Sequence, residues 1–212
     1  QEGRQATVYQ LTSSPIGEEG KPEGSAARAI KVFKPRYRLP DMVSVAEDIT
    51  PYARMPGLLV CERTVFTPQE HAGLLHQHPD LTYAVLMPWI EGPTWMEVMG
   101  GARTLSRNES LALARSLAEI LASMEQRRLA HCDLSGPNVM LPGFLQSESE
   151  DTSAIALVDV EQLYGPGLAR PEFLPSGSQG YAHRSASDAI WGPRADRFAG
   201  AVLLAEMLGW CE

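Results

Sequence analysis

The chain contains little cysteine and few aromatic residues. Three cysteines, Cys61, Cys132 and Cys211, are scattered through 212 residues, and aromatic side chains account for 7%. An odd number of isolated cysteines favours free thiols in a reducing compartment over a disulfide framework. We therefore expect a cytoplasmic location.

Basic residues are in the minority, with 18 Lys and Arg against 26 Asp and Glu and a formal net charge of −8. A nucleic-acid-binding protein would usually carry a basic stripe, so we expect no nucleic-acid partner. No apolar run reaches the ~18 residues that indicate a membrane span. No basic segment followed by an apolar one directs the chain to secretion. We expect neither a membrane span nor a leader.

Hydrophobic residues make up 44% of the chain, which is sufficient for a sizeable core. The first half is rich in short β-branched and aromatic runs that favour strands. The Gly-, Pro-, Ser- and Glu-rich segment 13–25 predicts a long hairpin loop, and apolar residues at helical spacing predict a helix within 40–54. The four predicted strands are residues 7–11, 29–33, 58–61 and 83–87.

The second half favours helices. Ser106 and Glu109 have the spacing of a capping box, in which each side chain bonds the backbone N–H of the other. Apolar residues at steps of three and four follow, and a second such stripe lies near the C-terminus. The two stripes are Ala114, Leu117, Ala118, Leu121 and Met124, and then Phe198, Val202, Ala205 and Leu208. Strands followed by helices predict an α+β protein with a cleft between two lobes.

The segment His131–Asn138 carries the pattern most indicative of function. Asp133 is followed five residues later by Asn138, and Asp159 comes after the apolar run 155–158. An Asp in a loop can orient or deprotonate a hydroxyl, while an Asn and a second Asp can hold Mg²⁺ against the phosphates of a nucleotide. The alternatives are an Asx-turn pair in the loop and a capping acid at the strand end.

Two further residues can serve the same chemistry from the first half. Lys31 lies in a strand-like run, from which its ammonium could bind phosphates, although Lys34 is a competitor. Glu47 lies in the predicted helix and could pair with Lys31, with Asp48 as its rival. Solvated surface positions are the alternative for both.

In this order, a strand lysine, a helix acid, a His-x-Asp-x-x-x-x-Asn loop and a strand-end Asp, the residues resemble the protein-kinase-like superfamily. Residues 87–92 resemble the hinge between the lobes, and Gly180-Tyr181 resembles the end of an activation segment. Residues 195–208 resemble the central helix of the helical lobe, whose Asp196 would bind the backbone of the catalytic loop. The resemblance covers nearly the whole chain and is to a bacterial serine/threonine protein kinase-like domain with degenerate motifs.

The resemblance implies a bilobal α+β fold in a single domain, residues 1–212. Its N-lobe, residues 1–86, would hold an antiparallel sheet and one helix, and residues 87–93 would form the hinge. Residues 94–212 would form a mainly helical C-lobe that is partial, because a full lobe carries further helices. We therefore expect an additional C-terminal region.

The resemblance also implies the site and its cofactors, ATP and Mg²⁺. Asp133, Lys31 and Asn138 would be catalytic, and Asn138 and Asp159 would hold Mg²⁺. Met87 would guard the back of the adenine pocket. The implied nucleotide-binding residues are Gly3, Val8, Ala29, Lys31, Glu47, Met87, Pro88, Trp89, Ile90, Met140 and Asp159.

The chain departs from the family pattern at several positions. Only Gly3 remains of the glycine-rich loop, which weakens the cover over the phosphates. Cys132 replaces the arginine that clamps a phosphorylated activation loop, and Ser135 replaces the lysine that stabilises the transferring group. Asp159-Val-Glu161 stands in place of Asp-Phe-Gly, and the closing Ala-Pro-Glu is absent from the sequence.

The leading interpretation is a protein kinase that moves the γ-phosphate of Mg-ATP to a serine or threonine of a protein substrate. One alternative is a pseudokinase scaffold with weak or no nucleotide binding, which the departures favour. Another is a small-molecule kinase of the aminoglycoside or choline type, in which Asp-x-Glu is common.

Overall fold

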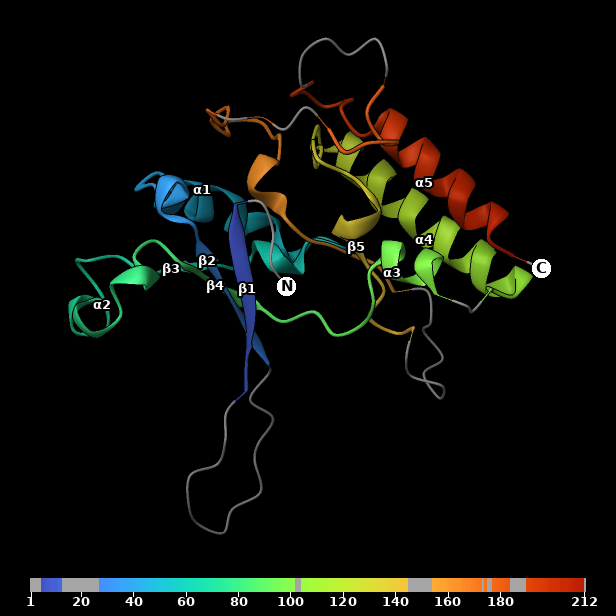
Figure 1. Ribbon diagram of the computed structural model, residues 1–212. Helices are drawn as coiled ribbons and strands as arrows, with labels where there is room; N and C mark the ends of the chain where they lie inside the picture. Colours follow the sequence, from blue (N-terminus) through green and yellow to red (C-terminus); the bar gives the residue numbers. More distant parts are fainter. Residues whose placement is uncertain are drawn as a thin grey trace. The chain divides into compact units, whose positions relative to one another are not determined.

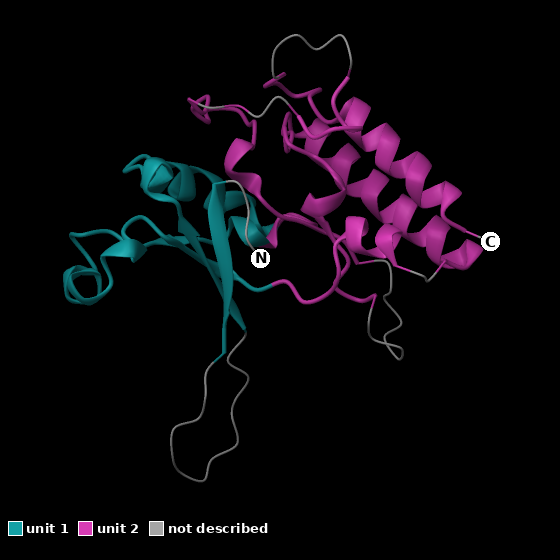
Figure 2. Cartoon of the chain, viewed as in Figure 1, with its two compact units in different colours: residues 1–54, 60–89 teal, residues 55–59, 90–212 magenta. Residues whose placement is uncertain are grey.

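The chain is an α+β protein that divides into two compact units, as the computed structural model shows (Figures 1 and 2). The first unit comprises residues 1–54 and 60–89, and the second comprises 55–59 and 90–212. The boundary after Trp89 lies within 87–93, the segment predicted as the hinge.

The structure describes residues 5–12, 27–101, 104–144, 154–172, 174, 177–183 and 190–211. The expectations for Gly3 and for the loop 13–25 lie outside the described residues.

A four-stranded antiparallel sheet forms the first unit, in the order β1-β2-β4-β3. The predictions for the first two strands are confirmed, because β-branched residues and cross-strand apolar contacts favour an extended chain there. The strands are β1 (Ala6–Leu11), β2 (Arg28–Phe33), β3 (Thr64–Val65) and β4 (Val85–Pro88).

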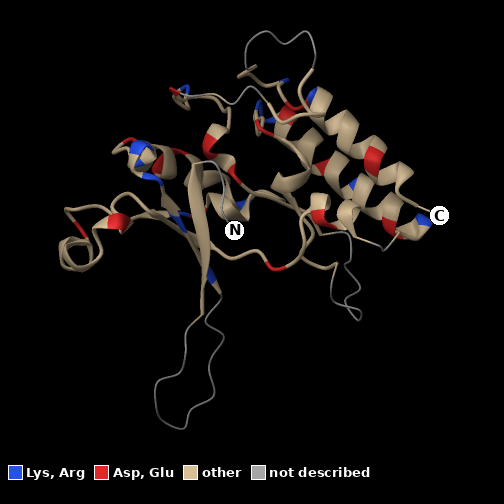
Figure 3. Cartoon of the chain, in the orientation of Figure 1, with Lys and Arg blue, Asp and Glu red and all other residues tan. Residues whose placement is uncertain are grey.

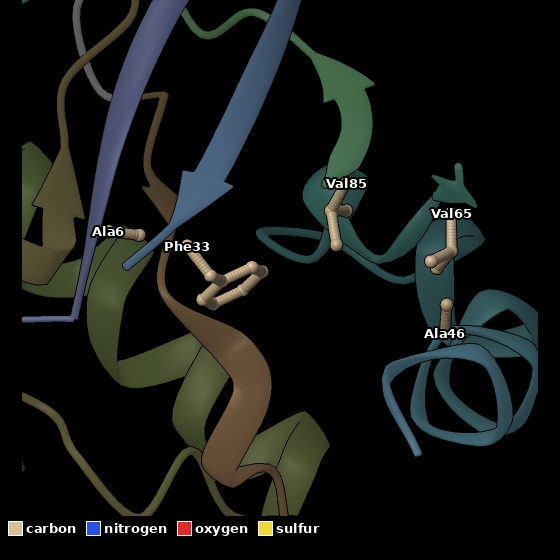
Figure 4. Packing of buried hydrophobic residues seen from close by; sticks show 5 residues of the cluster. All are labelled: Ala6, Phe33, Ala46, Val65 and Val85. Carbon is tan, nitrogen blue, oxygen red and sulfur yellow. The ribbon is translucent and has the colours of Figure 1, made fainter. Parts of the chain in front are cut away.

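The core of the first unit lies between one face of this sheet and α1 (Met42–Ile49) (Figure 4). Ala6 pairs with Phe33 across β1 and β2, and Val65 pairs with Val85 across β3 and β4. Directly paired residues project from the same face of a sheet. Ala46 of α1 completes the cluster, and all five side chains are buried.

The predicted strand at 58–61 is wrong. Leu59–Cys61 is a 3₁₀ helix, which follows Gly57 at a φ of +79°. The backbone carbonyls of this segment find side-chain partners in place of a strand ladder: Arg63 Nε donates to Val60 O at 2.8 Å, and Thr50 Oγ1 donates to Cys61 O at 3.3 Å. The short strand β3 takes its place in the sheet.

Two other predicted elements have different ends in the structure. The helix predicted within 40–54 stops at Ile49, because Pro51 has no N–H with which to continue the helical ladder. The chain continues as a 3₁₀ turn over Thr50–Arg54. The strand predicted at 83–87 begins only at Val85, since Tyr83 has a left-handed φ of +60° that an extended strand does not accommodate.

The second unit is built on the helices α4 (Arg107–Gln126) and α5 (Arg197–Gly209), which lie side by side in Figure 1. The capping box at the start of α4 is confirmed: Ser106 N–H donates to Glu109 Oε2 at 2.8 Å, and Glu109 N–H donates to Ser106 Oγ at 3.3 Å. A second capping box, Thr94 with Glu97, starts α3 (Trp95–Gly100).

α5 buries a different face from the apolar stripe noted in the sequence. Phe198, Ala205 and Leu208 are exposed, while the buried residues are Ala199, Gly200, Leu203 and Met207. This helix is apolar on nearly every side, so periodicity alone could not identify its inner face. Long-range contacts decide it, including the hydrogen bond from Ser110 Oγ of α4 to Met207 O at 2.6 Å.

A two-stranded antiparallel ribbon, β5 (Val139–Met140) with β6 (Ala156–Leu157), lies in the second unit. Leu157 N–H donates to Gly57 O at 2.8 Å, which ties the segment 55–59 to this unit. The remaining short helices are α2 (Ala72–Gln77) and the 3₁₀ turns Pro35–Tyr37, Pro79–Leu81, Gly136–Asn138 and Val160–Gln162.

Charged residues of both signs are interspersed over each unit (Figure 3). In the part of the chain that the structure describes, no helix has both the length and the apolar character needed to cross a bilayer.

Candidate functional site

The loop that starts at His131 is held by the carboxylate of Asp196. His131 N–H donates to Asp196 Oδ2 at 2.5 Å, and Cys132 N–H donates to Asp196 Oδ1 at 2.9 Å. The expected contact between Asp196 and the backbone of this loop is confirmed. Burial raises the pKa of the Asp196 carboxyl, and the charge of His131 and the two backbone N–H bonds oppose that rise.

His131 connects this loop to the end of β6. Its side chain is fully buried, with Nε2 at 2.8 Å from Val158 O. Asp133 N–H donates to Nδ1 at 3.3 Å. Since Nδ1 accepts this bond, Nε2 is the ring nitrogen that donates to the carbonyl. His131 is therefore an interior histidine whose ring nitrogens are both hydrogen-bonded.

Asn138 closes the loop onto Asp133. The side-chain amide Nδ2 of Asn138 donates to the backbone O of Asp133 at 2.8 Å, and Asn138 N–H donates to Ser135 O at 3.0 Å. The amide nitrogen thus fixes the path of the loop, but this bond is not the Asx turn of the alternative, in which the side-chain oxygen accepts from the N–H two residues on. The amide oxygen is the atom of this side chain with the chemistry of a metal ligand.

The ribbon brings Asn138 and Asp159 to one end of the same two strands. Val139 pairs with Leu157, and the next bond along the ladder runs from Val158 N–H to Asn138 O at 3.0 Å. Asp159 follows at once, exposed and with a left-handed φ of +67° that turns the chain into the next 3₁₀ helix. Asp tolerates this conformation better than most residues.

The residues at this end of the ribbon fit a magnesium ion. Mg²⁺ prefers oxygen ligands, keeps several waters, and is usually held by one or two carboxylates together with substrate phosphates. Asp159 offers a carboxylate and Asn138 an amide oxygen. Among the described residues no group of three His, Cys, Asp or Glu comes together, so the ion would depend on phosphate oxygens to complete its shell.

Cys132 occupies the position next to Asp133 with a left-handed φ of +66°. Its thiol lies 3.6 Å from Ala130 O. Burial, and then the nearby Asp196, raise the pKa of the Cys132 thiol to about 12. The side chain therefore stays a neutral thiol at physiological pH and supplies neither a positive charge nor a nucleophile to the loop.

We expect Cys132 to resist alkylation. At pH 8 the thiolate fraction of a thiol with a pKa of about 12 is roughly 1,000-fold below that of a thiol at 9, and only the thiolate reacts. Iodoacetamide labelling of the Cys132 peptide, followed by mass spectrometry, should be slower by about that factor in the folded protein than in 6 M guanidinium. Equal rates in the two states would contradict this environment.

In the first unit, four of the predicted nucleotide-binding residues share one face of the sheet. Val8 pairs with Lys31 across β1 and β2, and Ala29 pairs with Met87 across β2 and β4. Ala29 and Lys31 are two residues apart on one strand and so project to the same side. The register thus brings Val8 and Met87, which are distant in the sequence, to the same face as Ala29 and Lys31.

Lys31 is nearly buried, with 8% of its surface exposed, and its Nζ lies 5.5 Å from the centre of the Phe33 ring. This observation removes the alternative of a solvated strand lysine. Glu47, by contrast, is exposed on α1. Its pairing with Lys31 stays a prediction.

The remaining predicted residues lie at the end of β4 and in the second unit. Pro88 ends β4, and Trp89 N–H donates to Ala27 O at 3.0 Å. Ile90 is the first residue of the second unit after this strand and is largely buried. Met140 lies in β5, opposite Ala156.

Three further side chains, Trp95, Tyr181 and Glu206, meet beside the loop and were not predicted as a group from the sequence. Trp95 Nε1 and Tyr181 Oη both donate to Glu206 Oε2, at 2.9 Å and 3.0 Å. The Thr94-x-x-Glu97 capping box was a signal for the helix that carries Trp95. The meeting of three side chains so far apart in sequence had no local signal.

The chain matches no model of a known protein family and no curated protein sequence.

Proposed function

We propose that the protein is a phosphotransferase with a bilobal protein-kinase-like fold, which moves the γ-phosphate of Mg-ATP to a hydroxyl of a protein serine or threonine. The observation that carries the proposal is the hydrogen-bonded junction of Asn138 with Val158. It joins the loop of Asp133 to the chain immediately before Asp159. An orienting acid and two oxygen ligands on neighbouring segments are what phosphoryl transfer requires.

Within this proposal each residue of the loop has a distinct task. Asp133 orients the acceptor hydroxyl and takes its proton as the new bond forms. Asn138 and Asp159 would hold Mg²⁺, which supplies charge neutralisation at the phosphates when it is bound. Asn138 also fixes the backbone of Asp133 through its amide nitrogen. The loop thus links the site of proton removal to the site of metal binding.

The sheet of the first unit supplies the nucleotide contacts in this proposal. Lys31 would bind phosphates, because its largely buried ammonium can form charge-assisted hydrogen bonds with phosphate oxygens. Val8 and Ala29 on the same face would contact adenine, with Met87 behind it. Their shared face supports this assignment, because a nucleotide requires apolar contacts and a cation on one surface.

The proposal is tested by binding and by transfer. Thermal unfolding with and without Mg-ATP measures binding, and transfer of ³²P from γ-labelled ATP to the protein itself and to a generic protein substrate measures activity. Binding without transfer at any magnesium concentration would favour the pseudokinase. Transfer to aminoglycosides or choline, but not to protein, would assign a small-molecule kinase. The absence of both binding and transfer would reject the proposal.

Replacing Asp159 with asparagine is expected to weaken the metal site selectively. Loss of one anionic oxygen should raise the Mg²⁺ concentration for half-maximal ATP stabilisation by roughly 10- to 100-fold, the range seen when metal sites are disturbed. The measurement is the shift in unfolding temperature during a magnesium titration at fixed ATP. Asp80→Asn, at another exposed acid, is the matched control, and an equal effect in the two variants would reject Asp159 as a ligand.

A further inference from the structure

The carboxylate of Glu206 is shared by two donors from separate parts of the second unit. Trp95 starts α3 and is fully buried, and Tyr181 lies in the described segment 177–183 with 7% of its surface exposed. Both donate to the same oxygen of Glu206 on α5. Hydrogen bonds to an ionised acceptor are roughly twice as strong as neutral ones, so this arrangement fixes the place of the Tyr181 hydroxyl.

The same hydroxyl contacts the catalytic loop at Gly136. The backbone of Gly136 lies close enough to Tyr181 to oppose the rise in the pKa of its hydroxyl, and a Cβ atom added at Gly136 would lie only 2.8 Å from Tyr181 Oη. The φ of Gly136 is not left-handed, so the position excludes a side chain through lack of space. Gly136 lies three residues after Asp133 and begins the 3₁₀ turn that ends at Asn138.

The Tyr181 hydroxyl is protonated whenever it makes these contacts at physiological pH. Burial, and then the hydrogen bond to Glu206, raise the pKa of Tyr181 to about 12. The hydroxyl therefore keeps the proton that it donates to Glu206. One hydrogen bond and one close contact thus lead from α5 through Tyr181 to the loop at Gly136.

We infer that Glu206, Tyr181 and Trp95 are positioning residues for the loop 133–138, and we call them the Glu206 group. Tyr181 holds the turn at Gly136, and Glu206, braced by Trp95, holds Tyr181. The inference rests on the proposed function, since the loop is taken to carry the transfer. The inference couples two segments physically. Because Tyr181 of the segment 177–183 contacts Gly136 of the loop, a displacement of either segment also displaces the other.

A pair of substitutions tests the contact directly. Gly136→Ala should lower kcat by roughly 10- to 100-fold, because displacements of about 1 Å have effects of that size, with little change in the KM for ATP. Tyr181→Phe should lower kcat less, since the ring stays in place. The double variant should recover to the level of Tyr181→Phe, because the oxygen that collides with the new methyl group is gone. If the loss of kcat in the double variant equalled the product of the losses in the two single variants, the inference would be overturned.

Hydrogen exchange gives a readout that does not depend on activity. Amides of 131–139 should exchange faster in Gly136→Ala and return towards the wild-type rate in the double variant, while those of α4 stay unchanged. Gly73→Ala is the matched control, since a Cβ at Gly73 meets nothing within 4 Å. Absence of transfer by the wild type would reject the proposed function alone, whereas failure of the double variant to restore exchange would reject the positioning role.

Discussion

Asp133→Asn should reduce phosphoryl transfer by about 10²- to 10⁴-fold, the range for loss of a general base, while Mg-ATP binding stays unchanged. The substitution removes the negative charge and the ability to take a proton, yet it keeps the size of the side chain. Under the proposed function, Asn138 and Asp159 hold the metal, so nucleotide binding does not depend on the Asp133 carboxylate.

The structure makes Asp133→Asn a clean test, because the loop uses the backbone of Asp133 to hold its shape. Its carbonyl accepts from Asn138 Nδ2, and its N–H donates to His131 Nδ1. Both bonds persist when the side chain becomes an amide. A fall in activity would therefore report on the chemistry of residue 133 and would not reflect a collapsed loop.

Transfer of ³²P and the unfolding temperature with Mg-ATP should be measured side by side on wild type and variant. Asp80→Asn, the same change at an exposed acid of the first unit, controls for the loss of one negative charge. Transfer that survives in Asp133→Asn would show that another group takes the proton, and the assignment of Asp133 would then be wrong.

Asp196→Asn should destabilise the second unit and lower activity together. The carboxylate accepts from two backbone N–H groups, and an asparagine can accept only one of them while its amide group opposes the other. A buried N–H left without an acceptor costs about 1–3 kcal/mol of unfolding free energy. The unfolding temperature should fall by roughly 2–4 °C for each kcal/mol in a chain of this size.

The pH dependence of this loss has a defined sign. Because burial raises the pKa of Asp196 above its ordinary value of 3.8, the folded state holds this proton more tightly than the unfolded state does. The contribution of the ionisable group to stability therefore decreases as pH rises above 3.8 through the raised pKa. The difference in unfolding free energy between wild type and Asp196→Asn should shrink over that interval.

Denaturant unfolding at several pH values, together with ³²P transfer at neutral pH, measures both effects. Arg197→Gln is a suitable control, because it removes the neighbouring exposed ion pair with Glu125. Exposed pairs contribute little to stability, so its unfolding temperature should stay close to that of the wild type. A wild-type advantage that grows with pH would show that the two N–H bonds outweigh burial at Asp196.

Local patterns in the sequence predicted the elements that depend on neighbouring residues. The Ser106-x-x-Glu109 box starts α4 where expected, and the β-branched runs form β1 and β2. A cap or a strand preference acts within a few residues, so a short window contains its cause. The segment 58–61 is an exception: its short apolar run predicted a strand, but its carbonyls bond to the side chains of Arg63 and Thr50.

Other features depend on which distant groups satisfy one another. α5 is apolar on most of its surface, and only its packing against α4 decides that Leu203 and Met207 face inward. Likewise, nothing near Trp95 in the sequence indicates Glu206. A buried polar atom must find a partner, but the chain alone does not say where that partner will be.

By itself, the sequence determined the chemical inventory of the candidate site: Asp133, Asn138 and Asp159 in this order, with Lys31 in a strand and Cys132 in place of a cation. The tertiary structure decided how these groups are held. The ribbon register joins Asn138 to the end of β6, Asp196 holds the start of the loop, and Tyr181 Oη lies against its turn at Gly136. The type of a residue sets the chemistry of its side chain, whereas contacts between residues that are distant in the sequence set its position.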